Sequence, residues 1–291
     1  MIPAAFAYHA PATLAEASAL LVRYGDDAKI LSGGQSLIPL MKLRLASPQN
    51  IIDINRVPGL AYVREDGGVL RIGALARESD LDESDLVRER YPLLHDTSRT
   101  IADPLVRNLA TVCGNLAHAD PANDHPAAML ALGAEVVAVG PGGERRLPIA
   151  TFFSGPFTTA LAAGEIISEV RVPAPGPRSG GAYQKLERKV GDFATAGVAV
   201  QVILAADGTC ERAGIGLTNV GATPIEAARA EAFLRGRRPD DGAVAQAARL
   251  ASEECDPADD ARGPADYKRD LVRVLTGRAL RRALARARGG R

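Results

Sequence analysis

A short apolar strand that ends at two adjacent glycines is the feature that most constrains this chain. Residues 28–31 have the composition of a strand, and Gly33 and Gly34 follow almost directly. Glycine permits tight backbone geometry that a bulky side chain forbids, and successive free N–H groups in such a turn form a concavity for an anion. Residues 32–36 are therefore a candidate phosphate-binding loop, although paired glycines after a strand also fit a plain turn.

A second turn of small residues occupies positions 111–115, with a hydroxyl at Thr111 and an amide at Asn115. Carboxylates follow at Asp120 and Asp124. This set of groups suits a pyrophosphate together with ribose or ribityl hydroxyls. Neither turn has the G-x-G-x-x-G spacing of a Rossmann fingerprint or the G-x-x-x-x-G-K-[ST] spacing of a P-loop, which disfavours the two common nucleotide-binding folds.

The remaining pattern alternates short strands and helices. Thr13 and Glu16 form a capping box before a helix that stops near Gly25. We expect strands at 51–54, 69–75 and 134–139 and a helix at 126–132, which together indicate a mixed α/β unit. After the Pro/Gly cluster at 173–181, we expect strands at 196–204 and 213–217 and helices at 224–234, 243–254 and 265–288. The prediction is an α+β fold with two domains, residues 1–177 and 178–291.

Charge and cysteine content exclude several classes of function. Lys+Arg and Asp+Glu both number 35, so no global field favours nucleic acid, and we interpret the basic end at 278–288 as one face of a solvated helix. No apolar run reaches the length of about 20 residues that a membrane span needs, and a cytoplasmic location is expected. The three cysteines form no C-x-x-C pair, which argues against a disulfide framework, zinc or an iron–sulfur cluster here. The loop from His118 to His125 is rich in Asp, Asn and Pro, a composition typical of turns, so we interpret it as a turn rather than a metal site.

The two glycine turns stand in longer motifs that resemble the medium flavoprotein subunit of aerobic carbon monoxide dehydrogenases, within the molybdenum hydroxylase family that includes xanthine dehydrogenases. The resemblance spans nearly the whole chain and keeps the motifs in order. The motifs that carry the resemblance are residues 27–45, 52–56, 114–121, 183–194 and 267–271.

The resemblance implies a vanillyl-alcohol-oxidase (PCMH)-type FAD domain followed by a smaller C-terminal domain of the carbon monoxide dehydrogenase flavoprotein type. It also implies that the two loops bracket the FAD diphosphate, that Asp124 contacts ribityl or ribose hydroxyls, and that Phe193 shields one face of the isoalloxazine. As a whole it assigns FAD contacts to Lys29, Ile30, Leu31, Ser32, Gly33, Gly34, Gln35, Ser36, Ile101, Thr111, Val112, Cys113, Gly114, Asn115, Asp124, Ile167, Lys185 and Phe193.

Two positions depart from the family pattern. Ser32 replaces an alanine, which adds a hydroxyl, and Cys113 replaces the first glycine of the second motif. A side chain at Cys113 could crowd the diphosphate, and we expect an inert residue there rather than a reactive thiol. Gln35 stands in the loop where covalent relatives of this fold carry His or Cys, so FAD attachment is expected to be non-covalent.

The expected function is electron transfer within a complex. The resemblance implies that a large molybdopterin subunit hydroxylates substrate, that a small [2Fe-2S] subunit carries the electrons, and that FAD in this chain passes them to an external acceptor. It also implies assembly as a dimer of heterotrimers. Two rival hypotheses stay open: a self-sufficient FAD-dependent dehydrogenase or oxidase, and a non-catalytic assembly protein that retains the flavin fold.

Overall fold

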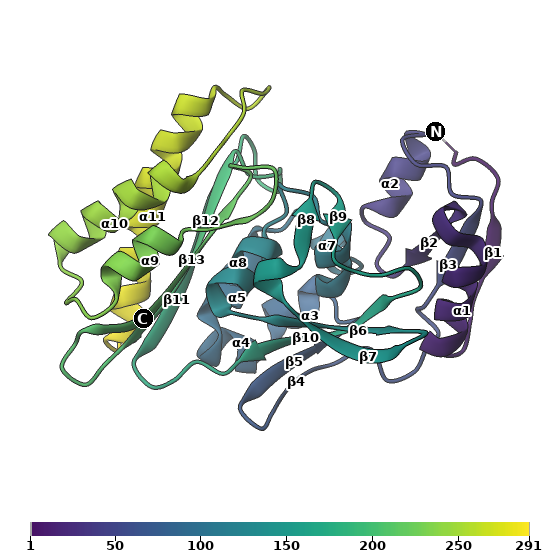
Figure 1. Cartoon of the computed structure of the whole chain (residues 1–291), viewed down its shortest axis with the longest axis horizontal. Coiled ribbons are helices and arrows are strands. Elements are labelled where there is room, and N and C mark those ends of the chain that lie inside the picture. Colours follow the sequence, from purple (N-terminus) through teal and green to yellow (C-terminus); the bar gives the residue numbers. More distant parts are fainter. Residues whose placement is uncertain (1, 291) are drawn as a thin grey trace.

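The computed structural model describes residues 2–290, which form three neighbouring parts along the long axis (Figure 1). The N-terminal part is a parallel sheet of order β1-β3-β2, formed by Ala7–His9, Asn50–Asp53 and Ala28–Leu31. Helix α1, Leu14–Tyr24, packs on this sheet, and Thr13 Oγ1 accepts the amide of Glu16 at its start. The predicted capped helix and the predicted strand before the glycines are both confirmed.

The middle part is an antiparallel sheet of order β4-β5-β10-β6-β7, with helices packed on one face. Its strands are Val63–Asp66, Val69–Gly73, Ile166–Pro173, Glu135–Gly140 and Gly143–Pro148. Its helices are α3 Glu78–Glu83, α4 Asp85–Arg90, α5 Pro92–Thr100, α6 Pro104–Arg107, α7 Val112–His118 and α8 His125–Leu132. Short elements complete this half of the chain: α2 Leu37–Lys42, β8 Phe153–Gly155, β9 Thr158–Thr159, and 3-10 turns at Gly25–Asp27 and Ile149–Thr151.

The C-terminal part is a second antiparallel sheet, β11-β12-β13-β14, that separates two groups of helices (Figure 1). Its strands are Ser179–Leu186, Ala196–Leu204, Cys210–Thr218 and Ile225–Glu226. Helices α9 Ala228–Leu234, α10 Asp241–Glu254 and α11 Ala265–Ala287 cover one face. Helices α5 and α8 of the middle part cover the other face, so the two larger parts share a continuous interior.

Helix α8 shows how closely these two parts pack. All eight of its residues are buried, as expected for a helix that is apolar on every side. It lies against β13 at two glycines, where an added Cβ would collide with backbone: Gly214 faces the carbonyl oxygen of Ala131, and Gly216 faces that of Ala127. Glycine at these two positions therefore permits backbone-to-backbone contact between a helix and a strand.

The structure corrects two expectations about secondary structure. The Pro/Gly cluster is a shorter connection than expected, because β10 extends to Pro173 and β11 begins at Ser179. The sequence pattern missed both of these strands. The helix expected at 224–234 begins only at Ala228, after the two-residue strand β14. The division of the chain at 177 and 178 stays a prediction.

Candidate cofactor-binding site

The first glycine loop connects the carboxyl end of β2 to α2. Gly34 has φ of +74°, a conformation that side chains rarely adopt, and the carbonyl oxygen of Gly34 accepts the amide of Ile38 at 3.0 Å. Within residues 2–290, the amides of Gly33, Gly34, Gln35 and Ser36 donate no hydrogen bond to protein. Four consecutive free donors in one turn form the kind of concavity that binds a phosphate.

The second loop leads into α7 and is capped by Thr111, whose Oγ1 accepts the amide of Gly114 at 3.1 Å. The same Oγ1 lies 3.0 Å from Ser32 Oγ in the first loop. Gly33 lies so close to the segment just before the second loop that a Cβ on Gly33 would collide with the carbonyl oxygen of Leu109. The two loops, almost 80 residues apart in the sequence, are therefore in direct contact, as their proposed joint role requires.

Two side chains hold the loops together from the side. Asn55 Nδ2 donates to the carbonyl oxygen of Ser32 at 2.8 Å. Arg77 donates to Asn55 Oδ1 at 2.7 Å and to the carbonyl oxygen of Leu109 at 2.5 Å. Asn55 lies in a motif that the sequence singled out, but Arg77 was missed, because nothing in its local sequence indicates that it reaches both loops.

Asp124 lies at the centre of a buried polar network. Its Oδ1 accepts the hydroxyl of Tyr183 at 2.6 Å, and its Oδ2 lies 3.0 Å from Lys185 Nζ. Burial raises the pKa of Asp124 above its ordinary value, while Lys185 and Tyr183 oppose that rise. Lys185 also donates to the carbonyl oxygen of Thr100 at 3.1 Å. Asp124 and Lys185, which were predicted separately as FAD contacts, are thus brought together, and Tyr183 is a third member that was not predicted as a site residue.

A surface loop that carries Phe193 rests on the segment after Ile101. An added Cβ at Gly191 would lie 2.8 Å from the carbonyl oxygen of Ala102, so these two segments touch. The Phe193 side chain is 46% exposed, and the guanidinium carbon of Arg262 lies 5.9 Å from its ring centroid. An exposed aromatic ring on a supported loop is available to cover a planar ligand.

Other predicted contacts lie on strands rather than on loops. Lys29, Ile30 and Leu31 belong to β2, an edge strand of the N-terminal sheet, and Lys29 is exposed. Ile167 lies on β10 with its side chain buried in the core of the middle part. Its side chain therefore packs in the interior and leaves only its backbone as a candidate for contact with a cofactor.

Family models and known relatives match this architecture over its whole length. Residues 4–175 match the FAD binding domain in molybdopterin dehydrogenase, and residues 181–283 match the CO dehydrogenase flavoprotein C-terminal domain. The carbon monoxide dehydrogenase medium chain of Hydrogenophaga pseudoflava is 46% identical over 98% of this chain and 99% of its own. The glyceraldehyde dehydrogenase medium chain of Sulfolobus acidocaldarius is 37% identical over 97% and 99%.

Solved structures agree with these matches. Carbon monoxide dehydrogenase from Hydrogenophaga pseudoflava, in a form that lacks the Mo-pyranopterin moiety, superposes with a TM-score of 0.95 at 48% identity, covering 98% of this chain and 99% of that chain. Quinoline 2-oxidoreductase from Pseudomonas putida 86 superposes with a TM-score of 0.91 at 33% identity, covering 99% of each chain.

The chain belongs to the FAD-binding medium subunits of the carbon monoxide dehydrogenase and xanthine dehydrogenase family. It is a flavoprotein oxidoreductase subunit whose cofactor is FAD, and the expected α+β fold, an FAD-binding domain followed by a CO dehydrogenase flavoprotein C-terminal domain, is confirmed. Among residues 2–290 of this medium subunit, no helix is long and apolar enough to cross a membrane.

Cys113 lies differently from what its position in the family motif suggested. Its side chain is buried, and its Sγ lies 3.7 Å from the carbonyl oxygen of Gly73 and 3.8 Å from that of Ile72. Burial raises the pKa of the thiol far above its ordinary value. The sulfur thus points into the core beside β5, so its position does not support the expected crowding of a diphosphate, and the expectation of an inert thiol agrees with its burial.

The histidine-containing loop of this medium subunit leads to a buried, hydrogen-bonded side-chain pair. His125 Nε2 lies 2.6 Å from Glu78 Oε2, and both side chains are fully buried. His118 lies 4.0 Å from Asp120. In the described part of the chain, no group of three His, Cys, Asp or Glu residues is arranged to hold a metal. Glu78 was missed because its partner is 47 residues away and its own sequence context resembles a solvated helix start.

Proposed function

We propose that this medium subunit receives electrons from the iron–sulfur clusters of a partner subunit and passes them through FAD to an external acceptor. The observation that supports this role best is the contact between the two loops, with Ser32 Oγ 3.0 Å from Thr111 Oγ1 beside four free amides. Bound FAD supplies the redox chemistry, so the protein needs to bind and orient it rather than provide an acid–base pair.

The geometry suggests a distinct role for each part of the site. The free amides of residues 33–36 and the amide of Cys113 near the start of α7 would bind the diphosphate. Asp124, held by Tyr183 and Lys185, would accept hydroxyl groups of the ribityl chain or ribose. Phe193 would cover one face of the ring system. The strand residues Lys29, Ile30 and Leu31, together with Ile101 and Ile167, would complete the walls of the site.

Attachment of FAD is proposed to be non-covalent. Covalent relatives of this fold use a His or Cys on the loops that line the flavin, whereas the first loop offers only Gln35, whose amide side chain cannot form the bond. Cys113 in the second loop directs its sulfur into the core. Acid precipitation of the purified protein should release the flavin into the supernatant, and flavin that stays in the washed pellet would contradict this proposal.

The proposed partners are a small [2Fe-2S] subunit and a large molybdopterin subunit, assembled as a dimer of heterotrimers. Relatives of similar length have names that refer to carbon monoxide, glyceraldehyde and caffeine dehydrogenases. Such diverse substrates on one type of medium chain support the idea that substrate is chosen in another subunit. A cytoplasmic location is part of the same proposal.

Gly33 provides the sharpest test, because a Cβ there would push the first loop away from Leu109. The variant Gly33→Val should be expressed with the genes of the partner subunits, beside Gly142→Val, where the added Cβ has no neighbour within 4 Å. We expect the assembled Gly33→Val protein to lose flavin absorbance and acceptor reduction, while substrate still reduces the iron–sulfur clusters. Gly142→Val should retain both activities.

Other outcomes would favour the rival functions. A yellow protein without iron or molybdenum that oxidises a small substrate by itself would support a self-sufficient dehydrogenase. A colourless protein that takes up no FAD even in the presence of the partner subunits would support an assembly protein. Full flavin content in the assembled Gly33→Val protein would contradict the role assigned to the loop contact.

A further inference from the structure

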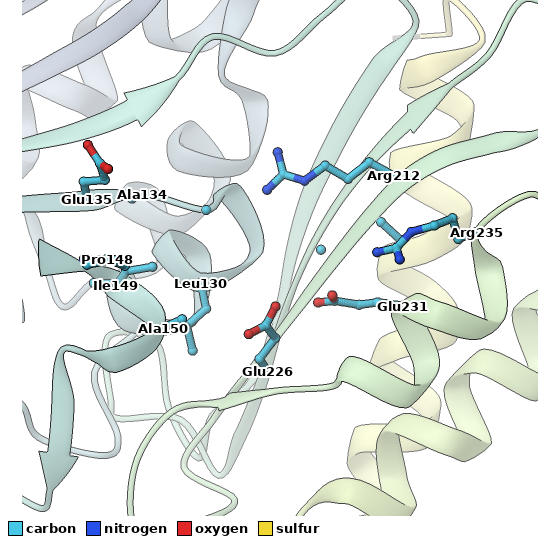
Figure 2. Close-up of a pocket in the computed structure, with 13 residues that line it drawn as sticks. Leu130, Ala134, Glu135, Pro148, Ile149, Ala150, Arg212, Glu226, Glu231 and Arg235 are labelled. Atoms are coloured by element: carbon cyan, nitrogen blue, oxygen red, sulfur yellow. The ribbon is translucent and has the colours of Figure 1, made fainter.

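A cavity of about 340 Å³ lies between the middle and C-terminal parts, and none of the predicted FAD contacts lines it (Figure 2). One wall comes from the end of α8 and from Pro148, Ile149 and Ala150. The opposite wall comes from β13, β14 and α9. Cavities of this size at the boundary between structural units are common sites for small molecules. The FAD site leaves this cavity without a function.

Charged side chains of both signs face this cavity. Arg212 extends from β13 and Arg235 follows α9, while Glu226 lies on β14 and Glu231 on α9. In Figure 2 the two carboxylates point toward each other and Arg212 extends toward the opposite wall. Within residues 2–290, neither guanidinium forms an ion pair with either carboxylate. Opposite charges in one cavity ordinarily approach each other, so their separation needs a cause.

A backbone hydrogen bond supplies that cause for Glu231, and the space beside Gly133 accommodates Arg212. Glu231 is only 8% exposed, and its Oε1 accepts the amide of Ile215 at 2.7 Å, which fixes the carboxylate against β13. Arg212 Nη2 occupies space beside Gly133, only 2.6 Å from where a Cβ of that residue would lie. The absence of a side chain at Gly133 therefore makes room for the guanidinium. The Glu231 carboxylate is already held in place, so it loses less entropy when a ligand arrives.

We propose that this cavity binds a small zwitterion with an apolar side chain, which is the chemistry of a free aliphatic amino acid. Arg212 and Arg235 bind its carboxylate, and Glu226 and Glu231 bind its ammonium group. The apolar side chain packs against Leu130, Ala134, Pro148, Ile149 and Ala150 of the opposite wall, whose one charged lining residue is Glu135, next to Ala134.

The electrostatics of Glu231 agree with a cationic group at this position. The pKa of Glu231 is raised to about 7, chiefly by burial and to a smaller extent by the nearby Glu226 carboxylate, while the amide of Ile215 and the Arg212 guanidinium oppose the rise. A bound ammonium group between the two carboxylates would relieve their repulsion and favour the ionised form of both. The guanidinium groups alone could hold an anion. The test must therefore separate the contribution of the two arginines, the carboxylate arm, from that of the two glutamates, the ammonium arm.

Three molecules with the same branched chain separate the contributions of the arms. L-leucine carries both charges, 4-methylpentanoate lacks the ammonium group, and 3-methylbutylamine lacks the carboxylate. Isothermal titration calorimetry should use the full-length protein with the subunits that accompany it in purification. We expect leucine to bind and each analogue to bind at least about tenfold more weakly, which corresponds to the loss of one charged interaction.

Matched variants then assign the arms to residues. Arg212→Gln and Glu226→Gln should each weaken leucine binding by about tenfold or more. Arg278→Gln and Glu211→Gln change exposed residues outside the cavity and should leave it unchanged. Because Arg235 is exposed, Arg235→Gln is a second test of the carboxylate arm if Arg212→Gln fails to fold.

Three results would overturn the proposal. The first is no heat of binding with leucine in the wild-type protein. The second is equal affinity for leucine and 4-methylpentanoate, which would show an anion site. The third is wild-type affinity in folded Arg235→Gln and Glu226→Gln variants. Flavin content does not enter any of these readouts, so they are independent of the proposed electron transfer.

Discussion

Arg286 and Asp96 form a bidentate ion pair that joins the last helix, α11, to α5 of the middle part. Nη1 lies 2.7 Å from Oδ2, and Nη2 lies 3.1 Å from Oδ1. The side chains are 18% and 9% exposed, and Nη1 also donates to the carbonyl oxygen of Gly181. The sequence suggested a solvated basic face for this end of the chain, and Arg286 shows that this interpretation is wrong for one of its arginines.

Loss of this pair should loosen the contact between the two larger parts. Arg286→Gln leaves Asp96 largely buried without its main partner, and we expect a loss of about 2–3 kcal/mol in the free energy of unfolding. Arg286→Lys should recover only part of it, because an ammonium group cannot make two parallel contacts. Urea denaturation provides the measurement. Arg273→Gln, which breaks an exposed pair with Asp270, should cost less than about 1 kcal/mol, and equal losses at both sites would contradict the prediction.

The contact between α8 and β13 should be intolerant of any side chain. Gly216→Ala places a methyl group against the carbonyl oxygen of Ala127, so the helix must move away from the sheet. We expect a loss of about 3 kcal/mol or more, in the range of strong overpacking. Gly142→Ala is the control, since open space surrounds that position. A thermal unfolding midpoint for Gly216→Ala equal to that of Gly142→Ala would show that the contact can relax.

The three cysteines should be inert in the folded protein. All are buried, and burial raises the pKa of each thiol, that of Cys210 to about 11. Because the thiolate is the reactive form, iodoacetamide should modify none of them in mildly alkaline native solution. After denaturation, mass spectrometry should find all three modified. A native adduct at Cys113 would show that the second loop opens and exposes the core behind it.

Glu231 should make stability depend on pH in the direction opposite to that of an ordinary ion pair. The folded protein retains a proton on Glu231 up to about pH 7, whereas the unfolded chain loses it near the ordinary value of 4.5. The unfolded state then binds fewer protons between these values, so this residue's contribution to stability falls as pH rises through that window.

The variant Glu231→Gln isolates this contribution. As pH rises from about 4.5 to about 7, the free energy of unfolding of this variant should increase relative to that of the wild type, by up to about 3 kcal/mol in total. The Gln side chain can still accept the amide of Ile215, and Glu211→Gln is the exposed control. Urea midpoints at several pH values give the difference curve, and a flat curve would show that Glu231 titrates normally.

The sequence predicted the parts of the fold that depend on local chemistry. The capped helix before Gly25, the strand before Gly33 and the long helices near the end follow from patterns within one element. Strands β10 and β11 escaped prediction because they flank a cluster of Pro and Gly that resembles a linker. Glycines at 180 and 181 lie inside β11, where they make room for α11 and α5 on the two faces of the sheet. Their role depends on neighbours that a local pattern does not contain.

The same distinction applies to the candidate site. Composition indicated two loops suited to phosphate, and the family resemblance indicated that they act together. The residues that hold them, Asn55 and Arg77, act across separations of more than 20 residues. Cys113 illustrates the reverse case. Its place in the second loop follows from the sequence, but the direction of its side chain depends on how α7 packs against β5.

The contact of Gly33 with Leu109 also has a consequence for how the protein matures. The first loop is synthesised long before the segment that supports it, so a nascent chain or proteolytic fragment that ends before residue 109 lacks half of the anion-binding surface. Such a fragment also lacks Ile166 and Gly164, which pack on or hydrogen-bond to the N-terminal part, so it cannot present a complete nucleotide site. Cofactor uptake should therefore be a late event in the life of the chain, which favours release of incomplete products without flavin.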